Sequence, residues 1–322
     1  MSVILALDIS LAALVLAVAV WTIASREAFA AVVGYVAYGL LVSLVWVRLF
    51  AVDVALTEAA IGSGVTGVLL ISAAVRLRAT EAAVSVEWPG AGSRVLTAAL
   101  CILVTAALAA VVLMMPDPGA TLAPEAARHL PETALGNPVT AVLMAFRALD
   151  TLLEKVVLFL AVIGVWSLAA DGNWGGIAGP RRAPHRKGAL AFLAQLLPPV
   201  GIVVAIHIVW VGANEPGGAF QGGAILAAMW LIVIMARLAG APAIGGRRLR
   251  LALVAGPAVF LAVGLVGFAV AGAFLAYPSG LAKPLIVFIE IFMTLSIAVS
   301  LPMLVLGPPD RPTERPAERP PS

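Results

Sequence analysis

The stretch VILALDISLAALVLAVAVWTIA, residues 3–24, is followed almost at once by AFAAVVGYVAYGLLVSLVWVR, residues 28–48. Each block contains about 20 mostly apolar residues, the length that a helix needs to cross a hydrocarbon core of about 30 Å. The blocks therefore predict two membrane-spanning helices joined by a tight turn. No basic residue precedes the first block, so we expect a retained helix and not a cleaved secretion signal.

The rest of the 322-residue chain repeats this pattern, with 62% hydrophobic and only 11% charged residues. Soluble domains carry about a quarter charged residues. We predict an all-α, polytopic membrane protein of about nine transmembrane helices. The predicted spans are 3–24, 28–48, 54–75, 94–115, 139–170, 190–211, 217–239, 250–275 and 284–306.

Charge placement predicts the orientation. Most of the 20 Lys and Arg residues follow odd-numbered spans, with clusters in 181–187 and 247–250. Under the positive-inside rule, the N-terminus lies outside and the C-terminus lies in the cytoplasm. We expect a multi-pass protein of the cell inner (plasma) membrane, in contact with the lipid bilayer. The placement of the basic residues is explained by the orientation of the helices in the membrane, so we expect no nucleic-acid partner.

Two loops rich in Gly, Pro and Arg, near 76–93 and 171–189, divide the chain. We expect a three-helix module over 1–85, a two-helix module over 86–180 and a four-helix module over 181–307. The proline-rich segment 308–322 is predicted to be a disordered cytoplasmic tail. Loop 116–138 is expected to form a short surface helix.

The chain lacks the residues of a catalytic or cofactor-binding centre. It has one Cys, and its three His residues, His129, His185 and His207, lie far apart in sequence. We therefore expect no protein-bound metal. No phosphate-binding glycine loop and no nucleophile–base pattern is present, so we expect neither an enzyme nor a cofactor.

Charged residues inside spans are the candidates for function, because each costs roughly 2.5–3.5 kcal/mol at a helix centre. The fifth span contains Arg147, Asp150, Glu154 and Lys155, which project onto an arc of about 140° on a regular helix, opposite Leu152 and its apolar neighbours. They are expected to face other helices or a wet cavity. They form either a structural ion-pair stripe or a relay in which Glu154 and Lys155 bind an ion or change protonation.

The third span opens with Asp53, which is expected to cap the helix start, and Glu58 lies further inside. Glycines at 62, 64 and 67 permit either close helix packing or an unwound segment beside Glu58. An ion site and a packed interface both remain open.

Between the sixth and seventh spans lies a glycine-rich motif. We expect Asn214 to be an N-cap, Glu215 to favour the positive end of the helix dipole and Pro216 to occupy a first helical turn. The density of glycine suggests close backbone approach or a locally open helix. The glycines are Gly217, Gly218, Gly222 and Gly223.

Two further ionisable groups lie within predicted spans. His207 is more often a packing residue than a proton carrier in such a position. Glu290 is a functional candidate in the ninth span, or else a partner for an absent subunit. With the predicted orientation, nearly all these groups fall in the outer half of the membrane. We predict an aqueous vestibule that admits cations from outside.

Three stretches resemble known modules. DVALTEAAIGSG, residues 53–64, is similar to the small membrane subunit of Mrp-type antiporters and membrane-bound hydrogenases, and to the equivalent C-terminal region of the large antiporter subunit. FRALDTLLEKVVLFLAVIGVW, residues 146–166, resembles the adjoining two-helix element. GANEPGGAFQGG, residues 212–223, resembles the Mrp B signature.

The resemblance implies a fusion of MbhD-like, MbhE-like and Mrp B-like (MnhB) modules in a multisubunit Na⁺(K⁺)/H⁺ antiporter. It implies that Glu58 and Glu154 take part in ion translocation, with other membrane subunits, monovalent cations and protons as partners. Two alternatives stay open. One is a membrane-arm subunit of a redox-driven pump related to complex I or to hydrogenases, and the other is a scaffold without its own ion path.

Overall fold

The computed structural model describes residues 3–81, 90–116, 119, 121–179 and 188–311. The predicted module boundaries at 85/86 and 180/181 lie outside these residues, as do the basic cluster at 181–187 and His185. The division into three modules therefore remains a prediction.

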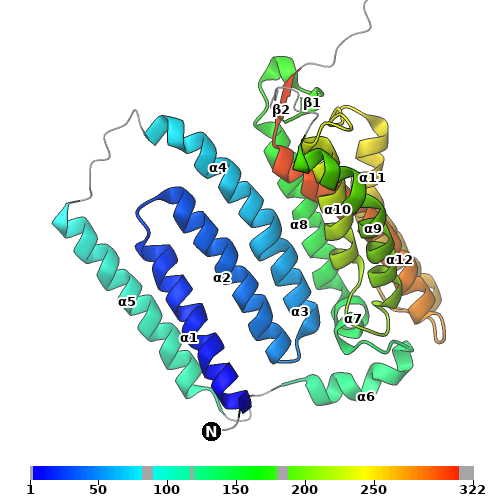
Figure 1. Cartoon of the computed structure of the whole chain (residues 1–322). Coiled ribbons are helices and arrows are strands. Elements are labelled where there is room, and N and C mark those ends of the chain that lie inside the picture. Colours follow the sequence, from blue (N-terminus) through cyan, green and yellow to red (C-terminus); the bar gives the residue numbers. More distant parts are fainter. Residues whose placement is uncertain (1–2, 82–89, 117–118, 120, 180–187, 312–322) are drawn as a thin grey trace, which may run out of the picture.

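The described chain is almost entirely helical (Figure 1). The N-terminal elements are α1 (Val3–Ala24), α2 (Ala28–Arg48), α3 (Val52–Thr57), the π-helix η1 (Glu58–Val65), α4 (Thr66–Glu81) and α5 (Ala91–Met114). The middle elements are α6 (Ala123–Thr133), α7 (Pro138–Ala141), the π-helix η2 (Val142–Phe146), α8 (Ala148–Ser167), the short 3₁₀-helix η3 (Asp171–Asn173) and strand β1 (Ile177–Ala178). The C-terminal elements are α9 (Ala189–Val211), α10 (Ala219–Met235), α11 (Arg247–Ala271), α12 (Ala282–Leu306) and strand β2 (Pro309–Arg311).

Among the described residues, 7 helices are long and apolar enough to cross a membrane. The continuous helix 52–77 through η1 is one of them. The other two predicted spans are also helical but differ in kind. α10 has only 17 residues, and α8, with 20, carries three charged side chains. An all-α multi-pass membrane protein is thus confirmed, whereas the count of nine and the orientation remain predictions.

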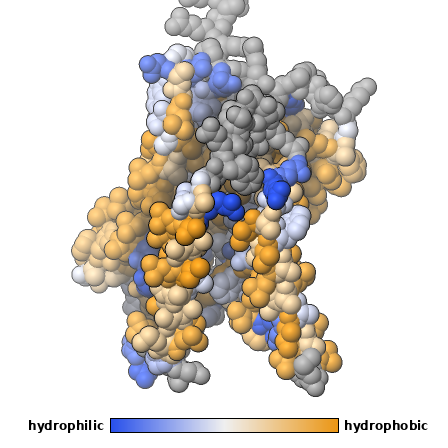
Figure 2. All heavy atoms as spheres, turned by 90° about the vertical axis from the view of Figure 1, so that its left-hand side faces the viewer, coloured by the Kyte–Doolittle hydropathy of each residue, from blue (hydrophilic) through white to orange (hydrophobic). Residues whose placement is uncertain are grey.

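The N-terminal helices form an open layer. α1 packs on α2, and α2 packs on η1 and α4. Neither α1 nor α5 has a buried residue, and both expose apolar side chains along their length. Viewed from this side, the molecule is mainly hydrophobic (Figure 2). Such surfaces are stable only against lipid or the apolar faces of other membrane subunits.

The C-terminal helices are packed more closely, and glycine makes this possible. α10 lies between α9 and α12, while α8 and α11 pack against α12 and each other. A side-chain carbon at Gly223 would lie 2.8 Å from the Ile297 side chain of α12. One at Gly222 would lie 3.0 Å from the Ala205 carbonyl of α9. Small residues therefore let three backbones approach, as is typical of helix interfaces in lipid.

The tail differs from the prediction at its start. β2 pairs antiparallel with β1, so the chain after α12 is anchored to the connection that follows α8. The backbone of Pro309 and Arg311 finds hydrogen-bonding partners there, which the composition of the tail does not reveal. The prediction of disorder from 308 is wrong for 309–311, and 312–322 lies outside the described residues. The predicted surface helix in 116–138 is confirmed as α6.

An open apolar pocket of about 270 Å³ lies between the N-terminal and C-terminal helices. It is lined by η1 and α4 on one side and by α10 and α12 on the other, including Gly64, Ala228 and Pro302. The two groups of helices therefore do not pack tightly along their whole length. Their polar contacts are concentrated at the starts of α3 and α10.

Gly223→Leu tests the tight packing of α10. The added side chain overlaps Ile297 of α12, so we expect a loss of about 1–3 kcal/mol, the typical cost of overpacking. Thermal unfolding of the purified chain in detergent measures this. Gly164→Leu in α8 is the matched control, because no atom from another described part of the chain lies within 4 Å of the added carbon. Equal melting temperatures for the two variants would contradict the account of α10.

Candidate functional site

The third span is interrupted at Glu58, where η1 begins. The helix stays continuous but widens into π-helical geometry, which is rare and occurs often at functional sites. This irregular segment is also closely packed, and an ion site at Glu58 stays a prediction. A side-chain carbon at Gly67 would lie 2.7 Å from Val36 of α2, and one at Gly39 would lie 2.5 Å from the Ser63 hydroxyl of η1.

The half-buried Glu58 side chain lies against the interface of η1 and α2. A carbon at Gly39 would be 3.4 Å from its Oε1, and a carbon at Gly62 would overlap that oxygen. Both glycines thus leave space for the carboxylate. The neighbouring Ser63 hydroxyl is buried without a hydrogen-bond partner in the described structure. This combination places a carboxylate and a free hydroxyl beside irregular backbone inside a span.

The fifth span is also interrupted, between η2 and α8. Arg147 has φ −130° and ψ 37°, outside helical values, so a regular helical projection does not apply across it. Arg147 and Asp150 form a 2.7 Å ion pair on the surface of the chain. Leu152, predicted to lie opposite the charges, is buried in the core. Of the four charged side chains, only Lys155 is buried within this chain, so the prediction that all four face other helices or a wet cavity stays a prediction for the other three.

The carbonyls released by this break find side-chain donors. The Thr151 hydroxyl donates to the Leu143 carbonyl at 2.6 Å, and the Tyr277 hydroxyl donates to the Met144 carbonyl at 2.8 Å. Backbone polar groups freed in a membrane must be satisfied in this way. Sequence reasoning missed Tyr277 because its partner is distant in sequence.

Lys155 is a buried cation that forms an ion pair with an exposed carboxylate. Its side chain is 6% exposed and its Nζ lies 2.8 Å from Glu154 Oε1, whereas Glu154 is 57% exposed. The same ammonium lies 4.7 Å from the centre of the Phe220 ring of α10, within cation–π range. A buried cation therefore contacts a carboxylate that is available at the surface of α8.

Asp53 joins the three parts of the chain. It is buried, and its Oδ1 accepts a 2.8 Å hydrogen bond from the Gly217 amide, 164 residues away. Its Oδ2 accepts from Asn137 Nδ2 at 3.3 Å, and its carbonyl accepts from Gln221 Nε2 at 3.3 Å. Asp53 does not cap its own helix, because it lies inside α3, whose N-cap is Ala51. That prediction is wrong, since the carboxylate binds the start of another helix instead.

Asn137 and Thr140, which sequence reasoning missed, hold the loop 212–218 from the other side. Asn137 Nδ2 donates to the Glu215 carbonyl at 3.0 Å, and the Thr140 hydroxyl donates to the Gly212 carbonyl at 2.7 Å. The only sequence signal for Asn137 is Asn before Pro at the start of the fifth span, which is typical of an N-cap. Asn137 does cap α7, and its amide nitrogen additionally binds the distant loop.

The glycine-rich motif differs from prediction at its beginning. α10 starts at Ala219 with Gly218 as N-cap, so Asn214 and Pro216 lie in the loop and not in the helix. The physical reason is the backbone at Gly217 and Gly218, with φ +150° and +122°. These values extend the turn and favour glycine. The prediction of close backbone approach around the motif is confirmed.

A side-chain hydrogen bond connects the exposed part of this loop to α12. The Asn214 side chain accepts a 2.8 Å hydrogen bond from Lys283 Nζ at the start of α12. Glu215 and Pro216 are exposed beside it. His207, on the last turns of α9, is also exposed, so it is not a packing residue within this chain.

Glu290 is a residue of α12 and is 4% exposed. Its side chain packs against the start of α10, near Gly218. Its carboxylate lies near the backbone amide of Ala219, and its Oε2 is buried without a hydrogen-bond partner in the described structure. The sequence motifs place Asp53 and Glu290 far apart, but the fold brings both carboxylates to the same helix start.

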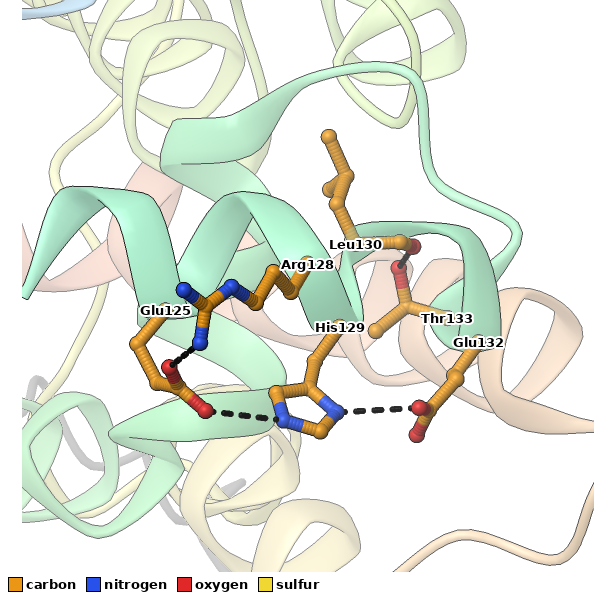
Figure 3. A network of polar contacts seen from close by, with 6 residues as sticks. All are labelled: Glu125, Arg128, His129, Leu130, Glu132 and Thr133. Atoms are coloured by element: carbon orange, nitrogen blue, oxygen red, sulfur yellow. Dashed lines mark hydrogen bonds and ion pairs between the residues drawn. The ribbon is translucent and has the colours of Figure 1, made fainter.

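The surface helix α6 carries a separate polar network (Figure 3). His129 Nδ1 lies 2.9 Å from Glu132 and its Nε2 lies 3.2 Å from Glu125, which also pairs with Arg128 at 2.8 Å. Both ring nitrogens face carboxylates, so the protonated imidazolium fits best. The hydrogen bond to Glu132, followed by the one to Glu125, raises the pKa of His129 above 6.5.

Taken together, the long apolar helices and the two irregular, charged spans define a multi-pass membrane protein. Residues 13–79 match the MbhD family model of MBH, and residues 189–307 match a domain related to the MnhB subunit of Na⁺/H⁺ antiporter. The chain thus has MbhD-like and MnhB-like parts, which are those of Mrp/Mbh-type membrane subunits of antiporters or related complexes. Neither match covers the MbhE-like module, which remains a prediction.

Two solved structures share the fold. One is the Mrp complex from Dietzia sp. DQ12-45-1b, with TM-score 0.73 and 24% identity over 95% of this chain. The chain spans about a third of the matched protein, 35% of its length. The other is the membrane-bound sulfane sulfur reductase (MBS), an archaeal respiratory membrane complex, with TM-score 0.56 and 24% identity. That match covers 67% of this chain and 98% of the other. A search of curated protein sequences gave no match.

The His129 network predicts a pH dependence for α6. Because the pKa of His129 is raised in the folded chain, its stabilising effect is present below about pH 6.5 and is lost as the pH rises through the raised value. NMR titration of the chain with labelled histidine measures that pKa. Glu132→Gln should lower it, and His207→Gln, in another helix, should not. An unchanged pKa in Glu132→Gln would contradict the network.

Proposed function

We propose that this chain is a membrane subunit of a multisubunit Na⁺(K⁺)/H⁺ antiporter and lines part of its ion path. The observation that carries the proposal is that its two irregular, π-helical spans each hold ionisable groups. These groups are Glu58 in η1 and the Glu154–Lys155 pair after the break at Arg147. Ionisable groups in a membrane span are costly and mark ion pathways by default.

Glu58 is suited to transient ion binding. Its carboxylate lies beside the unpaired Ser63 hydroxyl and a π-helical backbone, and glycines leave space around it. Transporters use carboxylates beside irregular backbone for monovalent ions. In this role, Glu58 exchanges a proton for a cation.

The Glu154–Lys155 pair is suited to proton transfer. Lys155 of α8 is buried with its ammonium over the Phe220 ring, whereas Glu154 is exposed at the chain surface. A lysine can release its proton on burial, whereas arginine cannot. Arg147 and Asp150 then set the local field from the surface of the same span.

The exposed apolar faces support partners. α1 and α5 have no buried residues, and the carboxylate of Glu154 lies on an open surface. In a bilayer these groups need neighbouring subunits or water to be stable. We therefore propose that the path is completed by other membrane subunits in the cell inner membrane.

A second candidate function is the membrane arm of a redox-driven pump. The likeness to the MBS complex, whose matched chain is covered over 98% of its length, favours it. In this alternative the same charged groups respond to electron transfer in another subunit. A scaffold role is the third possibility, in which the charges only hold helices together.

Cation uptake driven by a pH gradient into vesicles that contain the whole complex tests the proposal, with Na⁺, K⁺ and Li⁺ compared. Glu58→Gln and Glu154→Gln should each lower the rate by about tenfold or more, equivalent to about 1.4 kcal/mol on the barrier. Asp171→Asn, at an exposed site on η3, is the control and should transport normally. Normal transport by both glutamine variants in assembled complexes supports the scaffold, and a requirement for an electron donor supports the redox-driven pump.

A further inference from the structure

The open pocket between the two groups of helices is lined only by apolar residues. Its walls come from η1 and α4 on one side and from α10 and α12 on the other, and every lining residue is Ala, Gly, Val, Ile, Leu or Pro. Water in a buried site makes about two to four hydrogen bonds. The side chains of these walls offer none, so the pocket is unsuited to water, ions or polar metabolites.

The pocket lies near one end of the helices. On α10 it extends from Ala224 to Leu231, and this helix ends at Met235. On α12 it reaches Val305, one residue before the helix ends at Leu306. Seven residues of helix span about 10 Å, and one leaflet of the hydrocarbon core is about 15 Å deep. The pocket therefore fits within the depth of a single leaflet.

The pocket has room for a thin chain and not for a helix. A helix with its side chains is about 10–12 Å across, so a 10 Å length of it occupies roughly 800 Å³. The pocket has a volume of about 270 Å³. Small residues, among them Ala60, Gly64 and Ala228, give it depth between the helices. An unbranched hydrocarbon chain matches this space in shape and polarity, and a membrane supplies such chains at the open side.

Basic residues gather at the end of the helices where the pocket lies. α4 continues past the pocket, Arg237 follows α10 by two residues, and α11 begins at this end with two arginines. None of these four arginines forms an ion pair with another described residue. They outnumber the aspartates that follow α8 and α12, and such clusters attract anionic lipid headgroups. The arginines are Arg76, Arg237, Arg247 and Arg248, and the aspartates are Asp171 and Asp310.

We propose that the pocket binds one acyl chain of an anionic phospholipid, with the headgroup at the end of α10 beside Arg237. The lipid fills the space between the MbhD-like part and the MnhB-like part, beyond the hydrogen bonds that Asp53 makes at the other end of α10. A side chain from a neighbouring subunit is the competing occupant, and it would exclude the lipid. Lipid binding does not require that Glu58 or Glu154 move ions.

The test is photolabelling of the purified complex that contains the full chain, with phosphatidylglycerol that carries a diazirine on its acyl chain. Mass spectrometry should find the label on residues 60–68, 224–231 and 301–305, and excess unlabelled phosphatidylglycerol should remove it. Ala228→Phe places a ring in the pocket and should lower this labelling by about tenfold, equivalent to about 1.4 kcal/mol. Ala161→Phe, at an exposed site of α8 outside the pocket, is the matched control and should be labelled normally.

A diazirine phosphatidylcholine tests the headgroup. It should label the pocket less than phosphatidylglycerol does, and Arg237→Gln should reduce that difference. Equal labelling by the two lipids in wild type, or an unchanged difference in Arg237→Gln, would overturn the assignment of the headgroup.

Assembly of each variant is checked by size-exclusion chromatography. Unlabelled pocket residues in the assembled wild-type complex would overturn the proposal and indicate that a neighbouring subunit fills the pocket. Equal labelling of wild type and assembled Ala228→Phe would also overturn it. Glu154→Gln should lose transport yet keep the label, so the inference and the proposed function fail independently.

Discussion

The buried carboxylate of Asp53 is the constraint on which the arrangement of the molecule depends. Lipid supplies no hydrophobic force between membrane helices, so polar contacts and close packing must hold them together. Asp53 binds the Gly217 amide and the Asn137 side chain, and thereby joins the N-terminal, middle and C-terminal helices at one point. Further along the same helices, an apolar pocket of about 270 Å³ lies between η1 and α4 on one side and α10 and α12 on the other.

The helical fold follows from the sequence because an apolar block of membrane length can satisfy its own backbone hydrogen bonds in lipid only as a helix. The helix bounds of α1, α2 and α12 agree with the predicted spans within a few residues. The glycines beside Glu58 indicate an irregular segment at η1, but the break at η2 does not follow from hydropathy, since VLMAF is apolar. Its freed carbonyls are satisfied by distant groups, such as the Tyr277 hydroxyl that donates to the Met144 carbonyl, which no local pattern reveals. The β1–β2 pairing was missed for the same reason.

The candidate residues were predictable because buried charge is rare in membrane spans, but their partners were not. Sequence alone identifies Asp53 and Glu290 as candidates. It predicts that Asp53 caps the start of its own helix, whereas in the structure its carboxylate accepts a hydrogen bond from Gly217, just before α10. The rule for a regular helix also fails at Arg147, where the chain leaves helical geometry and the pair with Asp150 moves to the surface. Long-range contacts, which depend on packing, decide what each charged group does.

Hydrogen exchange of residues 212–221, followed by mass spectrometry in Asp53→Ala, tests this account most directly. Loss of a hydrogen bond to a charged group costs about 1.5–3 kcal/mol, so exchange of the Gly217 amide should accelerate by about tenfold or more. Asp150→Ala, which removes an exposed carboxylate, should leave that exchange unchanged. Unaltered exchange across 212–221 in Asp53→Ala would contradict the claim that this carboxylate joins the three parts of the chain.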